Sequence, residues 1–166
     1  MSKEITFKGN VLHVTGVDLK VGDKAPDFKV VTKDLKEVGL GDYSGKIKIL
    51  TTFPSIDTPV CEGQVKEFNE KVSSFENTVV LAISKDLPFA HSRFCMSFSI
   101  NNVETLSDYK YSSVAENYGV LIDELKLLTR AVFIIDKDDI IRYVQFAKEI
   151  TEPLNYQKVY EALKDI

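Results

Sequence analysis

The feature that most constrains the fold of this chain is the alternation of short apolar strands with amphipathic helices. Residues Lys46–Phe53 and Thr78–Ile83 are β-rich and largely apolar, which is typical of strands buried on both faces. Between them, four apolar residues recur at the three- and four-residue spacing of one buried helical stripe: Val65, Phe68, Val72 and Phe75. This order predicts an α/β fold in which helices pack against a sheet.

Other segments of the chain continue the alternation. They are an N-terminal β-hairpin (Ile5–Phe7 and Val11–Val14), a strand pair (Phe28–Val31 and Glu37–Leu40), a helix from Pro88 to Cys95, a strand at Val103–Leu106, a helical turn at Ser113–Tyr118, a strand pair (Leu127–Ile135 and Ile140–Phe146) and a helix at Tyr156–Leu163. The sequence shows no repeat and no linker, and its 166 residues suit one domain. We therefore predict a single domain over residues 1–166, with a central mixed sheet flanked by helices and preceded by the hairpin.

The composition of the chain argues against several functional classes. A net charge of −4 gives no general field for nucleic acid, and the longest uncharged runs are too short to span a bilayer. The first ten residues, MSKEITFKGN, lack the apolar core of a signal peptide. We therefore expect a cytoplasmic protein that binds neither nucleic acid nor membranes.

The chain has two cysteines, Cys61 and Cys95. Permanent disulfides are uncommon in the cytoplasm. A chain of this length also buries enough surface to fold without a disulfide or a metal. The two thiols therefore need another explanation.

Residues 54–61, PSIDTPVC, predict how the clearest helix begins. Pro59 suits the first helical position, and Thr58, which precedes a proline, suits an extended N-cap. Cys61 then takes the third helical position, where free N–H groups and the positive end of the helix dipole favour a thiolate. Because Cys61 also extends the apolar stripe, it should face the sheet from a shallow recess walled by Pro54 and Thr58. The pattern predicts an activated nucleophile.

Each of these residues also has a purely structural interpretation. Cys61 could be a small apolar filler on the stripe, since free cysteines are often buried and inert. Pro54 and Thr58 could serve as turn and cap. The proline-led helix start, with the cysteine at its N-terminus, favours the functional interpretation.

Cys95 lies late in the helix that follows Pro88. One helix, one strand and part of the next helix separate it from Cys61, which can place both cysteines on one face of the sheet. Cys95 is either a core residue or the thiol that resolves an oxidised Cys61, because a sulfenic acid condenses with a nearby thiol.

A metal site built from His13, Cys61, His91 and Cys95 is a less favoured alternative. The sequence lacks the close-spaced cysteine pairs of structural zinc sites. Without a C-x-x-C motif, a thioredoxin-type thiol–disulfide oxidoreductase is disfavoured too. We expect no metal and no cofactor, and we interpret His91 as an ordinary surface histidine.

Arg130 interrupts the apolar run Leu127–Ile135. Arginine is rarely buried unless it is paired, so in a central strand it would need an anion such as a thiolate or the oxygens of a peroxide. On an edge strand it would reach water or pair with a carboxylate such as Glu62. The sequence favours neither the buried position beside an anion nor these structural alternatives. Arg93 is a weaker candidate, because an arginine on a helix is more often solvated.

Residues 54–61 also match the P-x-x-x-T-x-x-C signature, so the chain resembles the peroxiredoxin family. Residues 22–28, GDKAPDF, look like the upstream segment of that family. The N-terminal hairpin and several further segments resemble its thiol peroxidase subfamily, the atypical two-cysteine peroxiredoxins: FPSIDT at 53–58, SRFC at 92–95, TLSDY at 105–109, YGV at 118–120 and TRAVF at 129–133. The resemblance covers nearly the whole chain.

This resemblance implies a thioredoxin-like fold and usually a homodimer. It implies that Cys61 is the peroxidatic cysteine and Cys95 the resolving cysteine of the same chain. Thr58 would hydrogen-bond the thiolate and the peroxide, Arg130 would stabilise the thiolate and polarise the peroxide bond, and Pro54 would shield the site from water. The substrates would be hydrogen peroxide and organic hydroperoxides, with thioredoxin as the reductant.

One segment departs from the family pattern. Residues 96–100, MSFSI, are bulkier than the small or glycine residues that often follow the resolving cysteine, which leaves the mobility of the Cys95 segment open. Since both cysteines sit on predicted helices and a disulfide needs Cα atoms within about 7 Å, we expect the first turn at Cys61, the Cys95 helix, or both to unravel. A redox-sensing or holdase-like protein that uses the same disulfide as a switch is the alternative function.

Overall fold

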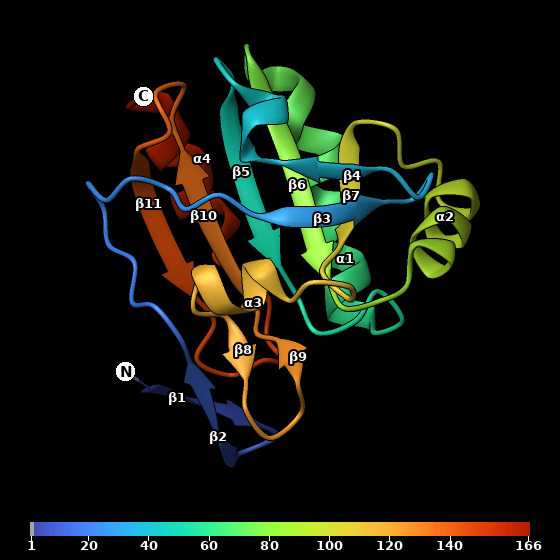
Figure 1. The fold of residues 1–166 in the computed structure, drawn as a ribbon, viewed down its shortest axis with the longest axis vertical. Coiled ribbons are helices and arrows are strands. Elements are labelled where there is room, and N and C mark those ends of the chain that lie inside the picture. The colour runs from blue at the N-terminus through green and yellow to red at the C-terminus, as the bar shows by residue number, and fades with distance from the viewer. Residues whose placement is uncertain (1) are drawn as a thin grey trace.

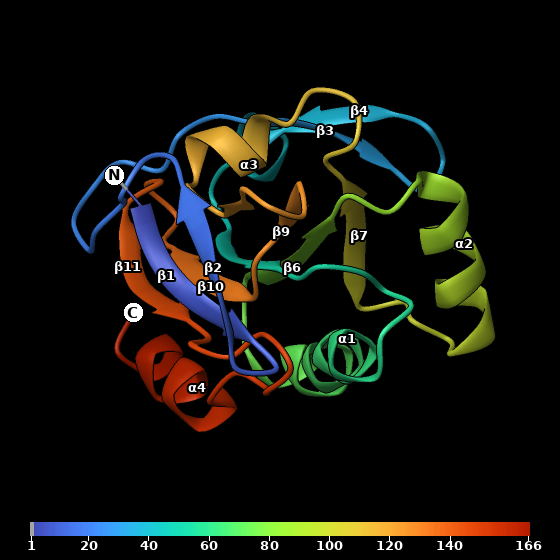
Figure 2. The same cartoon turned by 90° about the horizontal axis from the view of Figure 1, so that it is seen from below.

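The computed structural model describes residues 2–166 and contains a seven-stranded sheet with helices on both faces (Figures 1 and 2). The strands lie in the order β11 (Ile141–Phe146), β10 (Ala131–Ile135), β5 (Ile47–Thr52), β6 (Thr78–Ser84), β7 (Val103–Ser107), β3 (Lys29–Thr32) and β4 (Glu37–Gly39). Strand β6 is parallel to both β5 and β7, whereas the remaining pairs are antiparallel. The mixed sheet predicted from the sequence is therefore confirmed.

The helices divide between the two faces of this sheet. Helices α1 (Pro59–Lys71), α2 (Pro88–Ser97) and α4 (Tyr156–Lys164) contribute to one apolar cluster, and the short α3 (Ser113–Asn117) contributes to the other. Successive strand residues alternate between the clusters, as Ile49 and Leu50 do on β5. None of the helices described between residues 2 and 166 is long and apolar enough to cross a bilayer.

Helix α1 follows the predicted stripe. Val65 and Phe68 are buried in the helix, and Val72 is buried where a short 3-10 turn, η2 (Val72–Ser74), continues it. Phe75 packs at the margin of the same cluster. The apolar spacing thus fixes which face of α1 meets the sheet, and Cys61 lies on that face.

The N-terminal hairpin belongs to a second, four-stranded sheet. Its strands β1 (Ser2–Phe7) and β2 (Asn10–Thr15) confirm the predicted hairpin. Strand β2 also pairs with β8 (Leu121–Ile122), which pairs with β9 (Leu127–Leu128). The small sheet lies below the large one in Figure 1.

The strand predicted at Leu127–Ile135 is wrong as a single element. The chain leaves the small sheet after Leu128 and enters the large sheet at Ala131. At the break, the Thr129 N–H donates to the Val120 carbonyl at 2.8 Å, and the Arg130 carbonyl accepts from the Ala147 N–H at 2.9 Å. Arg130 therefore lies where the chain passes from one sheet to the other.

Candidate active site

Helix α1 begins as the sequence predicts. Thr58 has the extended backbone of an N-cap, Pro59 is the first helical residue, and Cys61 is the third. The Cys61 side chain faces the sheet and is fully buried. Its sulfur therefore lies within the first helical turn, where unpaired backbone N–H groups and the positive end of the dipole favour an anion.

Arg130 is the partner of Cys61. Its Nη2 atom lies 3.4 Å from the Cys61 sulfur, and its Nη1 atom donates to Oε1 of Gln64 at 2.7 Å. The guanidinium also donates to the Ile150 carbonyl, from Nε at 3.2 Å and from Nη2 at 2.6 Å. Arg130 is only 1% exposed, so the alternative of an edge position in water is wrong. The suggested pairing with Glu62 is wrong too, because that carboxylate binds Lys66.

Among residues 2–166, no carboxylate binds the Arg130 guanidinium. Within residues 2–166, its hydrogen-bonding partners are a side-chain amide, a backbone carbonyl and the Cys61 sulfur. A buried cation with neutral acceptors is unfavourable unless an anion joins it. A thiolate at Cys61 would be such an anion, and so would the negative charge that develops when the sulfur reacts.

Gln64 holds the guanidinium in place, a role that the sequence analysis missed. Its Nε2 atom donates to Thr51 Oγ1 at 2.6 Å and to the Thr52 carbonyl at 3.1 Å, so Oε1 is left to accept from Arg130. The available signal was a glutamine three residues after Cys61, which places a polar side chain on the same helical face as the thiol.

Thr58 matches the predicted cap in its backbone but not in its side chain. Its hydroxyl donates to the Ser55 carbonyl at 3.0 Å and makes no capping hydrogen bond to the helix. Because that bond uses its single proton, the hydroxyl oxygen can only accept from a ligand in this arrangement. The structure thus brings Thr58 beside the site without a hydrogen bond to Cys61.

A cavity of about 400 Å³ is lined by Thr58 and Arg130, whereas Cys61 and Gln64 lie buried behind its wall. It includes the expected walls Pro54 and Thr58, and Arg130 reaches it from the core. The remaining lining is mostly apolar. It comes from the loop and the first turn of α1 and from three other parts of the chain: Ser55, Pro59 and Val60; Phe7 and Lys8 of the hairpin; Leu125 and Leu127 before and in β9; and Ile150 and Thr151. The recess is therefore larger than the sequence suggested.

Cys95 is buried on the inner face of α2. Its sulfur lies 3.5 Å from Thr105 Oγ1 of β7. Both Cys95 and Cys61 are free thiols, and both belong to the apolar cluster on the same face of the sheet, as expected. In the bulky segment after Cys95, Met96 and Phe98 point outward and are exposed.

The interpretation of His91 as a surface residue is wrong. Its ring is fully buried, because it shares the inward face of α2 with Phe94 and Cys95. Nε2 lies 2.8 Å from Ser84 Oγ, and burial lowers the pKa of His91 to about 4, despite an opposing effect of Asp86. The ring is therefore neutral at pH 7.

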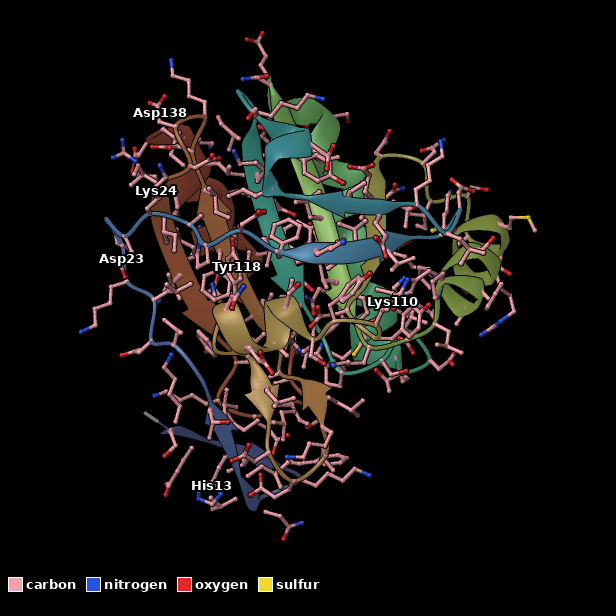
Figure 3. All side chains as sticks on the ribbon, in the orientation of Figure 1. His13, Asp23, Lys24, Lys110, Tyr118 and Asp138 are labelled. Atoms are coloured by element: carbon pink, nitrogen blue, oxygen red, sulfur yellow. The ribbon has the colours of Figure 1, made fainter. Side chains whose placement is uncertain are left out.

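The four residues of the alternative metal site are not assembled. His13 lies on the N-terminal hairpin at the lower end of Figure 3, where Nδ1 contacts Glu124 at 2.7 Å. His91 lies in α2, at the right of Figure 1. In the part of the chain that the structure describes, no three His, Cys, Asp or Glu side chains are grouped to hold a metal.

Arg93 is solvated, as expected for an exposed helical position, but it also has a partner. Its Nη2 atom donates to Asp57 Oδ1 at 2.9 Å, with both side chains more than half exposed. The pair connects α2 with the loop that precedes α1. By itself, an exposed ion pair of this kind contributes little stability.

Comparison with known proteins relates this arrangement to one family. The model of the AhpC/TSA family matches residues 21–144. A thiol peroxidase of Aquifex aeolicus is 48% identical over 169 aligned residues, covering 100% of this chain and 99% of its own, and one of Bacillus subtilis is 46% identical, covering 97% and 96%. The crystal structure of a peroxiredoxin-like protein from Aquifex aeolicus superimposes with a TM-score of 0.92 at 45% identity, covering 99% of this chain and 98% of that one.

Proposed function

We propose that Cys61 reduces hydroperoxides. The chain belongs to the AhpC/TSA family of peroxiredoxins. Its relatives that are named thiol peroxidase support a thiol-dependent peroxidase activity. One observation carries the assignment to Cys61. It is the buried Arg130 guanidinium, which lies 3.4 Å from the sulfur and has no carboxylate partner within residues 2–166.

The proposed first step is a displacement at oxygen. The Cys61 thiolate attacks the terminal oxygen of the hydroperoxide, an S–O bond forms and the O–O bond breaks. The leaving alkoxide takes a proton from water and departs as an alcohol, or as water when the substrate is hydrogen peroxide. Cys61 is left as a sulfenic acid.

The surrounding groups stabilise the charge as it moves. Thr58 accepts from the O–H of the peroxide, since its own proton is given to Ser55. Arg130 and the N–H groups of the first helical turn stabilise the negative charge shared by sulfur and oxygen. Pro54, in the wall of the cavity, excludes water from the reacting atoms.

Cys95 resolves the sulfenic acid in the proposed second step. Its sulfur attacks the Cys61 sulfur, the S–S bond forms, the S–O bond breaks and water leaves. Each cysteine lies within a helix, and Cys95 packs against Thr105 of β7. The proposal therefore requires helical turns to open before the sulfurs meet.

The cycle needs a dithiol to reduce the disulfide by exchange, and we propose thioredoxin for that role. Such a reductant, and free thiols in the resting state, fit a cytoplasmic location. The apolar lining of the cavity supports organic hydroperoxides as substrates beside hydrogen peroxide.

We propose that the protein is a homodimer. Four large apolar side chains on α2 and its flanks are exposed: Leu87, Phe89, Met96 and Phe98. Phe89 and Met96 lie seven residues apart on α2 and so share one face of the helix. Exposed apolar surface marks interaction sites, and a second copy would cover this face. Sedimentation equilibrium should give a dimer, and Phe89→Glu should weaken it. A monomer at all concentrations would contradict this proposal.

Peroxide-dependent oxidation of reduced thioredoxin tests the whole cycle. Cys61→Ser should abolish peroxide consumption. Cys95→Ser should allow one oxidation per chain and then stop turnover. Full activity in Cys61→Ser would refute the assignment, and oxidation as slow as that of an unactivated thiol would indicate the alternative redox-sensing function.

A further inference from the structure

Asp86 holds the loop that precedes the Cys61 helix. It follows the last residue of β6 by two positions, at the same edge of the sheet where β5 leads into that loop (Figure 1). Its Oδ1 atom accepts from Ser55 Oγ at 2.9 Å, and Oδ2 accepts from the Ile56 N–H at 2.7 Å. No step of the proposed reaction uses this carboxylate.

The same carboxylate is tied to the Cys95 helix through Ser84 and His91. Ser84 Oγ lies 2.6 Å from Asp86 Oδ2 and 2.8 Å from His91 Nε2. A carboxylate only accepts, so the single hydroxyl proton of Ser84 points to Asp86. Ser84 must then accept from His91, which fixes the neutral ring as the Nε2–H tautomer. The hydrogen bonds therefore run in one direction, from His91 to Ser84 to Asp86.

His91 lies one helical turn before Cys95 on the inward face of α2. This chain of hydrogen bonds, which is buried at His91 and partly buried at Asp86, links the helix of one cysteine to the loop before the other. The Arg93–Asp57 pair makes a second, exposed link between the same two segments. Opening α2 would withdraw His91 and Arg93 together from their partners.

We propose that Asp86 is a positioning residue that couples opening of the Cys95 helix to release of residues 54–58, so that the peroxide site is dismantled as the disulfide closes. The inference rests on the proposed function, since it needs Cys61 and Cys95 to form that disulfide. In the reduced protein the link keeps the loop in place for reaction with peroxide. The same link resists the opening of α2, so it slows closure of the disulfide.

Removing the link should therefore change the two steps in opposite directions. Asp86→Asn, which replaces a carboxylate oxygen by an amide donor, should slow oxidation of Cys61 and accelerate disulfide closure, each by roughly two- to tenfold. Ser55→Ala removes the bond from Ser55 to Asp86 and the 3.2 Å bond from the Asp57 N–H to Ser55 Oγ, but it keeps the bond from Ile56 to Asp86. It should therefore give a smaller change of the same signs. A general loss of structure would slow both steps.

Two comparisons isolate the link from ordinary destabilisation. Asp108→Asn is the matched control, because Asp108 also follows a strand of this edge but accepts from Val114 and Ala115 of α3. It should leave both rates near those of the unmodified protein. His91→Leu should accelerate closure of the disulfide. His91→Gln, whose amide can still donate to Ser84, should keep the closure rate near that of the unmodified protein.

The experiment is a single turnover with one equivalent of hydroperoxide, quenched in acid and followed by intact mass. Gain of one oxygen reports the sulfenic acid, and loss of two hydrogens reports the disulfide. If Asp86→Asn and Ser55→Ala alter neither step, or alter both in the same direction, the coupling is refuted while the proposed function stands. If the unmodified protein forms neither species, the proposed function fails and the coupling falls with it.

Discussion

Among residues 2–166, the Arg130 guanidinium donates to one amide, one backbone carbonyl and one sulfur. Two of these partners are neutral whatever the pH. The third, Cys61, is the only one that can become an anion by losing a proton. At the scale of the residue, the electrostatic balance of the site therefore depends on whether the sulfur carries a charge.

Arg130→Met tests this balance. Methionine keeps much of the buried volume but removes the charge and all donors. We expect oxidation of Cys61 by peroxide to slow by about 10²–10³, as when a donor to a developing anion is lost, with a smaller effect on disulfide closure. Rapid-quench mass spectrometry measures both. Arg142→Met, which removes an exposed arginine paired with Asp136, is the control and should leave both rates unchanged.

Gln64→Glu tests whether the lack of a carboxylate matters. A glutamate at this position would pair with Arg130 and compete with the thiolate for the guanidinium. We expect oxidation to slow by roughly tenfold or more. Gln64→Met also loses the bonds to Thr51 and Thr52 but adds no charge, so it should slow oxidation less. Equal rates in the two variants would show that charge competition is not the cause.

At the scale of the element, α2 is held to the sheet by a polar side chain that must stay neutral. Burial lowers the pKa of His91 to about 4 from an ordinary value of 6.5. At a pH between these two pKa values, His91 binds a proton in the unfolded chain but not in the folded chain. The contribution of neutral His91 to stability is therefore complete above pH 6.5 and is lost as the pH falls toward 4.

Urea unfolding of the unmodified protein and of His91→Gln measures this effect. As the pH falls from 7.5 to 4.5, the unfolding free energy of the unmodified protein should decrease relative to that of His91→Gln by on the order of 1–3 kcal/mol. Using the difference cancels groups that titrate in both proteins, such as His13, whose pKa is raised by Glu124. A difference that does not depend on pH would mean that His91 is not held neutral by the fold.

Local patterns predicted the elements better than the contacts between them. The stripe of α1 and the proline at its start are encoded within a few residues, and they placed Cys61 correctly. The prediction of an exposed His91 is wrong because it gives weight to the polarity of the residue and not to its spacing of three and four residues from Phe94 and Cys95, which share its buried face. Gln64 and Asp86 were missed because their partners are distant in the sequence.

At the scale of the whole molecule, the candidate active site is assembled from segments that lie far apart in the chain. The apolar run Leu127–Ile135 was predicted as one strand, but it serves both sheets and turns Arg130 inward between them. Hydrophobicity alone could not reveal that break. The hairpin, the loop before α1, β9 of the small sheet and Arg130, which directly precedes β10, all line one cavity. This supports the proposal that residues 1–166 form a single domain.

The contribution of the hairpin to the cavity predicts a role in substrate choice. Phe7 of β1 lines the same cavity as Pro54 and Thr58, although it lies about 50 positions away in the sequence. Phe7→Ala should lower kcat/KM for a bulky aromatic hydroperoxide by roughly five- to thirtyfold, because apolar contact with the substrate is lost. The value for hydrogen peroxide, which is too small to fill the cavity, should stay the same.

Val11→Ala is the matched control for this prediction. Val11 lies on β2 of the same hairpin, is 53% exposed and does not line the cavity. If it changes selectivity as much as Phe7→Ala does, the effect comes from stability of the hairpin rather than from contact with substrate. If Phe7→Ala lowers both values equally, the hairpin supports the site as a whole and does not select the substrate. Only a loss confined to the bulky hydroperoxide fits a hairpin that forms part of the binding surface.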